Sequence, residues 1–224
     1  MKHIKIINAL YLTNEGVISK HSNGKRHDFF IKQGCLDGAC APYSASMLLM
    51  ILGVLKRSDL EVYKVHDKRT KFGKIVDLFF QQKGLVRDGY NFEQLTQELQ
   101  VFKSAYDIQY HNEVESVLSI IEYHINSENP VLISVEYSGG AHALVAVGLE
   151  YNEQDEITKI LCIDPGYDHP KITYWNSVID IEKPETRKYK YTWLNNDTPV
   201  KLSDIITFDK KVKARDISGF FVYV

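Results

Sequence analysis

Cysteine is scarce in this chain, which has only Cys35, Cys40 and Cys162 in 224 residues. So small and odd a number excludes a disulfide framework and favours a reducing compartment. The predicted location is therefore the cytoplasm, with secretion in the absence of a conventional signal peptide left open. Long hydrophobic runs are missing as well, since none approaches the ~20 apolar residues of a membrane span. Residues 1–12 make a poor signal peptide because no small-x-small cleavage site follows them.

A strong net charge is also absent, because 27 Lys and Arg oppose 29 Asp and Glu, for a formal net charge of -2. Two basic clusters, 68–74 and 210–215, have acidic neighbours, which is typical of a solvated face. These patterns predict neither a nucleic-acid partner nor binding to an anionic membrane. No feature of the sequence predicts an oligomeric state.

The chain does contain enough apolar sequence for a sizeable core, since 44% of its residues are hydrophobic. Residues 42–55 are apolar almost all round, which is typical of a buried helix, and Pro42 lies in its first turn, where proline is tolerated. Before this helix, 4–12 is expected to form a strand or short helix and 14–27 a loop. Three amphipathic helices are expected after it, over 74–82, 91–104 and 113–125.

Beyond Pro130 the sequence changes to short β-rich runs separated by turn residues. These runs cover 131–135, 143–149, 157–163, 172–179 and 220–224. Helices followed by strands favour an α+β fold whose second half is an antiparallel sheet. The whole chain, 1–224, is interpreted as a single domain, with a helical lobe at about 28–128 and a sheet lobe at about 129–224.

Cys40 lies immediately before the buried helix. A helix N-terminus carries unpaired N–H groups and the positive end of the helix dipole, and both stabilise a thiolate, the reactive form of cysteine. The small residues Gly38 and Ala39 leave room for a substrate backbone, and the N–H of Cys40 is placed to bind an oxyanion. Cys40 is therefore a candidate nucleophile, while a small buried structural thiol is the alternative interpretation.

His142 and Asp164 are the candidate base and its orienting carboxylate. His142 follows Gly139 and Gly140 and opens a predicted strand, and Asp164 ends the next one. A carboxylate at the end of a neighbouring strand can fix the imidazole tautomer and stabilise the imidazolium. A structural histidine and an ordinary Asp-Pro-Gly turn are the alternatives for each residue alone. Together, a helix-start Cys, a strand-start His and a strand-end Asp form the arrangement that a thiol triad requires.

At these residues the sequence resembles the papain-like cysteine peptidase superfamily. Within it, the likeness is to the bacteriocin-processing (double-glycine leader) peptidases and their stand-alone relatives. The family pattern of Gln, then Cys-Gly-Pro, then small residues before Met and Leu is similar to the stretch from Cys40 to Leu49. The family's His strand resembles 141–148, and its Asp-Pro segment resembles Asp164-Pro165.

The resemblance implies a bacterial thiol hydrolase of papain-like α+β fold, with Cys40 at the start of a buried helix and His142 and Asp164 on the sheet. The implied reaction is cleavage of a peptide or protein substrate through a thioester, with no cofactor and no metal. In the family a glutamine upstream of the cysteine supplies a second oxyanion donor, and Gln33 is the matching residue. Two departures from the pattern are the spacing from Gln33 to Cys40, which is slightly longer than usual, and Ala41 in place of Gly.

Several alternatives stay open. The same triad serves an acyltransferase, a transglutaminase or a deamidase, and Ala41 with the long Gln33 spacing also suits an inactive binding module. Cysteine and histidine are zinc ligands, so a zinc site is a further alternative. Its ligands would be Cys35, Cys40, His142 and Cys162. Cys35 is near enough to Cys40 for a reversible disulfide that would silence the nucleophile. The aromatic candidates for lining a cleft are Tyr43, Tyr137, Tyr167 and Trp175.

Overall fold

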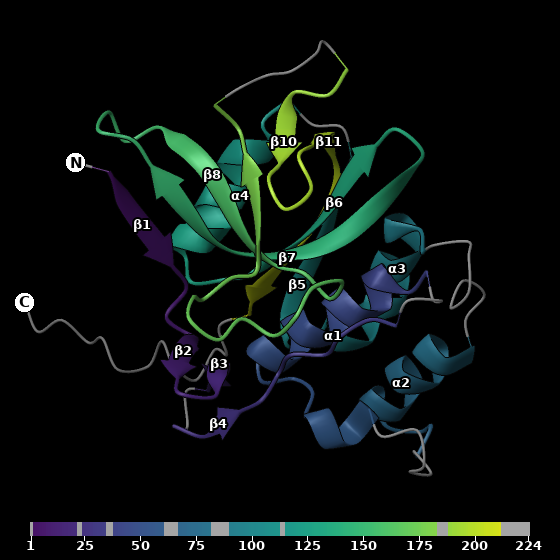
Figure 1. The fold of residues 1–224 in the computed structure, drawn as a ribbon. Helices are drawn as coiled ribbons and strands as arrows, with labels where there is room; N and C mark the ends of the chain where they lie inside the picture. Colours follow the sequence, from purple (N-terminus) through teal and green to yellow (C-terminus); the bar gives the residue numbers. More distant parts are fainter. Residues whose placement is uncertain are drawn as a thin grey trace, which may run out of the picture.

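The computed structural model of the chain describes residues 2–21, 24–34, 38–60, 67–81, 90–112, 115–182 and 188–211. Its helices are α1 (Cys40–Ile51), α2 (Lys71–Gln81), α3 (Phe92–Leu99) and α4 (Val117–Asn126), with 3-10 turns η1 (Arg57–Leu60) and η2 (Gln100–Phe102). Its strands are β1 (His3–Ile6), β2 (Leu10–Thr13), β3 (Gly16–Lys20), β4 (Arg26–His27), β5 (Tyr106–Asn112), β6 (Val131–Tyr137), β7 (Gly140–Tyr151), β8 (Ile157–Ile163), β9 (Ser177–Asp180), β10 (Tyr191–Trp193) and β11 (Thr198–Lys210). Figure 1 shows α1, α2 and α3 gathered beside a sheet that the second half of the chain builds.

The larger sheet has eight strands and closes on itself. Neighbouring strands follow the order β7, β6, β11, β10, β9, β8, and β8 pairs with β7 again. Strand β1 pairs with the second half of β7, and β5 pairs with the second half of β11. Strands β2, β3 and β4 form a separate small sheet. All described pairings are antiparallel. A small set of helices and a sheet-rich C-terminal part confirm the mixed class predicted from the sequence.

Helix α1 is the helix predicted from the apolar run 42–55, and it begins slightly earlier, at Cys40. It carries no charged side chain, nearly all of its residues are buried, and it packs against β7 and β6. The helix ends at Ile51 and its C-cap is Leu52; Gly53 follows with a φ of 75°, the left-handed conformation that glycine accepts. There the N–H of Val54 donates to the carbonyl of Leu49 (2.8 Å), which satisfies an orphan carbonyl of the last turn. Because the residues of α1 are buried against the sheet and its C-terminus is capped, the N-terminus of α1 has a fixed position.

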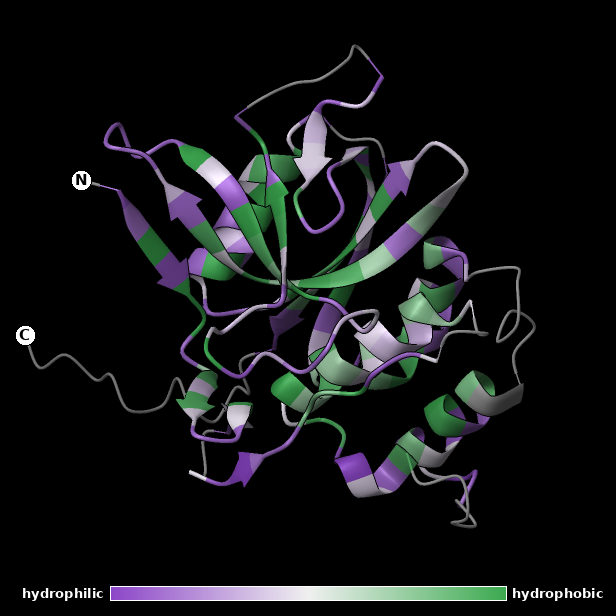
Figure 2. Cartoon of the chain, in the orientation of Figure 1, coloured by the Kyte–Doolittle hydropathy of each residue, from purple (hydrophilic) through white to green (hydrophobic). Residues whose placement is uncertain are grey.

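The hydrophobic core lies where the helices meet the closed sheet. Figure 2 shows hydrophobic residues along the central strands and the inner helices, and hydrophilic residues at β4 and in the outer loops. The largest fully buried side chains include Phe29, Met47, Leu48, Leu95, Ile121 and Phe208. Within the described ranges, no helix combines the length and the apolar character needed to traverse a lipid bilayer.

Most elements expected from periodicity are present. The predicted helices 74–82, 91–104 and 113–125 correspond to α2, α3 with η2, and α4. Asn91 caps α3 as expected, because its side chain accepts a hydrogen bond from the N–H of Gln94. The runs 131–135, 143–149 and 157–163 correspond to β6, β7 and β8.

The expectations were wrong where pairing is decided by distant partners. The predicted loop 14–27 contains β3 and β4, and 4–12 contains two strands separated by a turn. Of the run 172–179, only its last residues join a strand, β9. Strands β5, β10 and β11 were not predicted at all. The run 220–224 lies outside the described residues, as does most of the basic cluster 210–215.

Candidate active site

Cys40 is the first residue of α1, so its backbone lies at the positive end of a helix. Ala39 precedes the helix and provides no side-chain cap. One turn into the helix, the Ser44 hydroxyl donates to the carbonyl of Ala143 on β7 (2.9 Å), and Ser44 is fully buried. This bond ties the start of α1 to the residue next to His142.

The pairing of β7 with β8 brings His142 and Asp164 together. Val145 lies opposite Ile163, so the same register carried one residue past β8 places Asp164 opposite Leu144. Residues two apart in a strand share a face, and therefore Asp164 lies diagonally across from His142. The ring nitrogen Nε2 of His142 donates to Asp164 Oδ1 at 2.8 Å. Because Nε2 holds the carboxylate, Nδ1 is the nitrogen left to face the thiol.

The electrostatics of Cys40 and His142 favour an ion pair. Burial alone raises the pKa of the Cys40 thiol, but a hydrogen bond and the positive charge of His142, with backbone hydrogen bonds from Ala143 and Ala41, lower that pKa below its ordinary value. Burial likewise lowers the pKa of His142, but hydrogen bonds and negative charge from Asp164 and Cys40 outweigh it and raise that pKa to about 9. Near neutral pH these shifts favour a thiolate beside an imidazolium.

Asp164 is completely buried and is held by its own loop. Its Oδ1 accepts a second hydrogen bond from the N–H of Gly166 (2.7 Å). The side chain of Asn176 accepts from the N–H of Asp164 (2.7 Å) and donates to the carbonyl of Asp164 (2.9 Å). Asn176 therefore fixes the backbone from which the carboxylate extends. Its role was missed because Asn176 lies in a run predicted to be strand, and no local pattern distinguishes it.

Trp193 is a second residue that sequence reasoning missed. Its indole stacks on the His142 ring, with centroids 5.2 Å apart and planes 18° from parallel. The indole N–H donates to the Ser177 hydroxyl (2.7 Å), so the buried ring is fixed at its polar end. The indole ring covers one face of the imidazole and restricts the rotation of the His142 side chain. Trp193 lies in β10, a short strand without a local sequence pattern, which forms only by pairing with its neighbours in the sheet.

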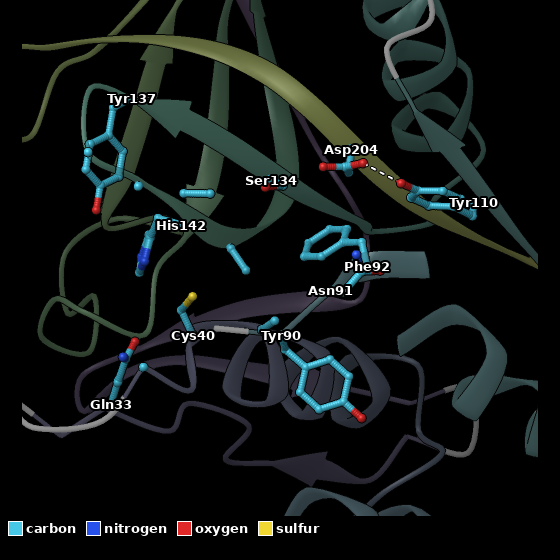
Figure 3. Close-up of a pocket in the computed structure, with 16 residues that line it drawn as sticks. Gln33, Cys40, Tyr90, Asn91, Phe92, Tyr110, Ser134, Tyr137, His142 and Asp204 are labelled. Atoms are coloured by element: carbon cyan, nitrogen blue, oxygen red, sulfur yellow. Dashed lines mark hydrogen bonds between the residues drawn. The ribbon is translucent and has the colours of Figure 1, made fainter. Parts of the chain in front are cut away.

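Gln33 reaches the same site from the segment that precedes α1. Its backbone N–H donates to the carbonyl of Pro165 (2.8 Å), which attaches this segment to the Asp164 loop. Figure 3 shows the Gln33 side-chain amide directed toward Cys40 and His142. The structure thus brings together all four residues proposed from the sequence, Gln33, Cys40, His142 and Asp164.

A pocket of about 670 Å³ opens beside the Cys40 thiol (Figure 3). One end holds Cys40, His142 and Gln33, and the other holds Tyr110 and Asp204. Between them the wall carries small residues of the β6–β7 turn together with Ser134 and the α3 cap segment from Tyr90 to Phe92. Of the aromatic residues suggested from the sequence, Tyr137 lines this pocket, whereas Tyr43, Tyr167 and Trp175 are not among its lining residues.

The remaining cysteines differ from Cys40. Cys162 is fully buried in β8, and burial raises the pKa of its thiol well above the ordinary range. Cys35 and any disulfide between Cys35 and Cys40 lie outside the described residues. Within the residues that are described, no group of three or more His, Cys, Asp or Glu side chains is arranged to hold a metal ion.

No protein-family model and no curated protein, bacteriocin-processing peptidases included, matches this chain. Among solved structures, the crystal structure of UfSP from C. elegans matches with a TM-score of 0.43 and 14% sequence identity. The match covers 94% of this chain and 34% of that chain, so this chain spans about a third of its length.

Proposed function

We propose that this chain is a papain-like cysteine peptidase in which Cys40 is the nucleophile, His142 the general base and acid, and Asp164 the residue that orients His142. The observation that carries the proposal is the relay between the three side chains. The Asp164 carboxylate accepts from His142 at 2.8 Å, and His142 in turn lies beside the Cys40 thiol at a helix N-terminus and lowers the pKa of that thiol. A lowered pKa for a partly buried thiol is otherwise unexpected, because burial alone raises the pKa.

In the acylation step, the Cys40 thiolate attacks the carbonyl carbon of the scissile amide and forms a tetrahedral adduct. The backbone N–H of Cys40 and the side-chain amide of Gln33 are the proposed donors to the oxyanion. The imidazolium of His142 then gives its Nδ1 proton to the leaving nitrogen. The C–N bond breaks, the amine departs, and a thioester to Cys40 remains.

In the deacylation step, neutral His142 takes a proton from water through Nδ1, and the hydroxide attacks the thioester. The C–S bond breaks, releasing the acid and returning Cys40 to the thiolate and His142 to the imidazolium. If a primary amine replaces water, the same steps give acyl transfer; if the amide belongs to a glutamine side chain, they give deamidation. We favour peptide-bond cleavage as the reaction because the motif from Cys40 to Leu49 resembles the pattern of papain-like peptidases.

The first test measures alkylation of each cysteine by iodoacetamide as a function of pH, read by peptide mass spectrometry. We expect Cys40 to react well below pH ~8.5, the ordinary pKa of cysteine, and to lose this low-pH reactivity in His142→Ala. Cys162 is an internal control in the same chain, because its buried thiol should label only after denaturation. Sluggish labelling of Cys40 in the folded protein, with no dependence on His142, would reject the proposal.

A second measurement identifies the reaction. The protein is incubated with a proteome-derived peptide library, with Cys40→Ala as the blank, and products are read by mass spectrometry. New peptide termini support a peptidase, added amines support a transferase, and conversion of Gln to Glu supports a deamidase. A library left unchanged by a protein whose Cys40 is reactive would contradict the peptidase assignment for the peptides sampled.

A further inference from the structure

Asp204 places a carboxyl group at the end of the pocket far from the Cys40 thiol. Of the 16 residues that line the pocket, Asp204 is the only Asp, Glu, Lys or Arg. The Tyr110 hydroxyl donates to Asp204 Oδ1 at 2.6 Å (Figure 3). Within the described ranges, no lysine or arginine forms an ion pair with Asp204, so its second carboxylate oxygen is available to a ligand.

Sheet register sets the distance between Asp204 and the candidate triad. His142 on β7 lies opposite Val135 on β6, and Val135 lies opposite Leu202 on β11. The register then shifts between Leu202 and Ile205, so Asp204 lies within a bulge of β11. Neighbouring strands are ~4.8 Å apart, which puts the Asp204 backbone about 10 Å from His142 across two strand spacings. An extended peptide covers that distance in about three residues.

The surroundings of Asp204 suit a cation. Tyr110 lies beside Asp204, and Tyr90 and Phe92 line the adjoining wall of the pocket. Aromatic faces attract a lysine ammonium or an arginine guanidinium, and a carboxylate adds a charge-assisted hydrogen bond. Among the described residues of the lining there is no lysine or arginine that would neutralise Asp204 in place of the substrate. A β-bulge commonly redirects a side chain beside a functional site, and here it lies at the position that turns Asp204 toward the pocket.

We propose that Asp204 selects a substrate with a basic side chain two or three residues from the bond that Cys40 attacks. This inference rests on the proposed thiol chemistry and adds the substrate class. Tyr110 acts as a positioning residue, because its hydroxyl fixes one carboxylate oxygen of Asp204 and leaves the other for the cation.

The test uses peptide alkylating agents that need only a reactive Cys40 and no turnover. Each probe carries an iodoacetyl group, a spacer of zero to three glycines, and then lysine amide or norleucine amide. Labelling rates at Cys40 are divided by the rate with iodoacetamide on the same variant, which removes differences in thiol reactivity. At the best spacing we expect lysine to label about tenfold faster than norleucine, the effect of one charge-assisted hydrogen bond. The preference should shrink in high salt.

Matched variants distinguish recognition from general electrostatics. Asp204→Asn keeps an oxygen that can accept from Tyr110 and removes the charge, and it should abolish the lysine preference. Asp107→Asn on β5 removes the same charge outside the pocket and should leave the preference intact. Tyr110→Phe should weaken the preference without abolishing it.

Three results would overturn the inference. A lysine preference that survives in Asp204→Asn would assign recognition elsewhere. Equal rates for lysine and norleucine at every spacing, with iodoacetamide labelling still dependent on His142, would remove the inference and leave the proposed function standing. A Cys40 without reactivity that depends on His142 would overturn both.

Discussion

Replacing Asp164 by asparagine tests whether the buried carboxylate sustains the thiolate. The substitution keeps the size of the side chain and an oxygen that can accept from Gly166 and His142. It removes the negative charge that, with Cys40, outweighs burial and raises the pKa of His142 to about 9. We therefore expect the variant to fold, to hold a less basic His142, and to form less thiolate at Cys40 near neutral pH.

The size of the effect follows from the pKa of His142. A value of about 9, against an ordinary 6.5, favours the protonated ring by roughly 3 kcal/mol. Asp164 and Cys40 share this stabilisation, and an equal division assigns about 1.5 kcal/mol to the carboxylate. Losing that amount lowers about tenfold the equilibrium constant that favours the thiolate–imidazolium pair over the neutral thiol–imidazole pair. The pKa of His142 should fall by about one unit, so the alkylation profile should change at alkaline pH, where the imidazolium is lost, and keep its low-pH limb.

Two readouts check this expectation in the same samples. The first is the iodoacetamide rate at Cys40 from acid to alkaline pH, with Asp168→Asn as the control, because Asp168 is an exposed neighbour paired with Lys32 (2.6 Å). The second is the difference in unfolding free energy between wild type and Asp164→Asn. Because the folded-state pKa of His142 is raised, its contribution is complete below pH 6.5 and is lost as pH rises through about 9. An alkylation profile identical to wild type would refute the assignment of Asp164 as the orienting residue.

Two further predictions separate chemistry from architecture. Gln33→Ala should lower the kcat of any peptide cleavage about 100-fold, as expected for the loss of one oxyanion donor, with iodoacetamide labelling of Cys40 unchanged because alkylation forms no oxyanion. Equal loss in both assays would mean that Gln33 shapes the site instead. Trp193→Ala should destabilise the fold by about 3 kcal/mol or more and slow Cys40 labelling, since it removes a buried ring stacked on His142. Ser177→Ala, which keeps the ring and removes its hydrogen-bond partner, should cost about 1 kcal/mol and leave labelling nearly intact, and a melting curve measures both changes.

Local pattern predicted the helices and the strands of the central hairpin because each shows its own periodicity. The apolar run after Cys40 has no polar face, and β6, β7 and β8 are buried runs bounded by turns. β11 was missed because charged residues interrupt its apolar pattern, and its three partners, β5, β6 and β10, lie on two different edges. β3 was missed because its pairing depends on the neighbouring β2 and on the hydrogen bond from Val17 to Pro170, which is distant in sequence.

The candidate triad was accessible from the sequence for a different reason. His142 lies near the start of β7 and Asp164 directly follows β8, so one hairpin register is sufficient to place them diagonally opposite each other. Trp193 and Asp204 had no comparable signal, because both belong to strands that reach the site only when the sheet closes.

The order of the strands also explains why catalysis and substrate recognition can be tested separately. Strand β7 carries His142 at one end of the pocket, and β11 carries Asp204 at the other, with β6 between them. The Asp204 backbone thus lies about 10 Å from the His142 backbone, roughly one Debye length at 0.1 M salt. At that separation a substitution at Asp204 should change the pKa of His142 or Cys40 only slightly. A peptide that spans the three strands, in contrast, contacts both ends of the pocket. A basic residue in the substrate therefore should change how tightly a peptide binds without changing how readily Cys40 ionises, and the normalised labelling rates measure that difference.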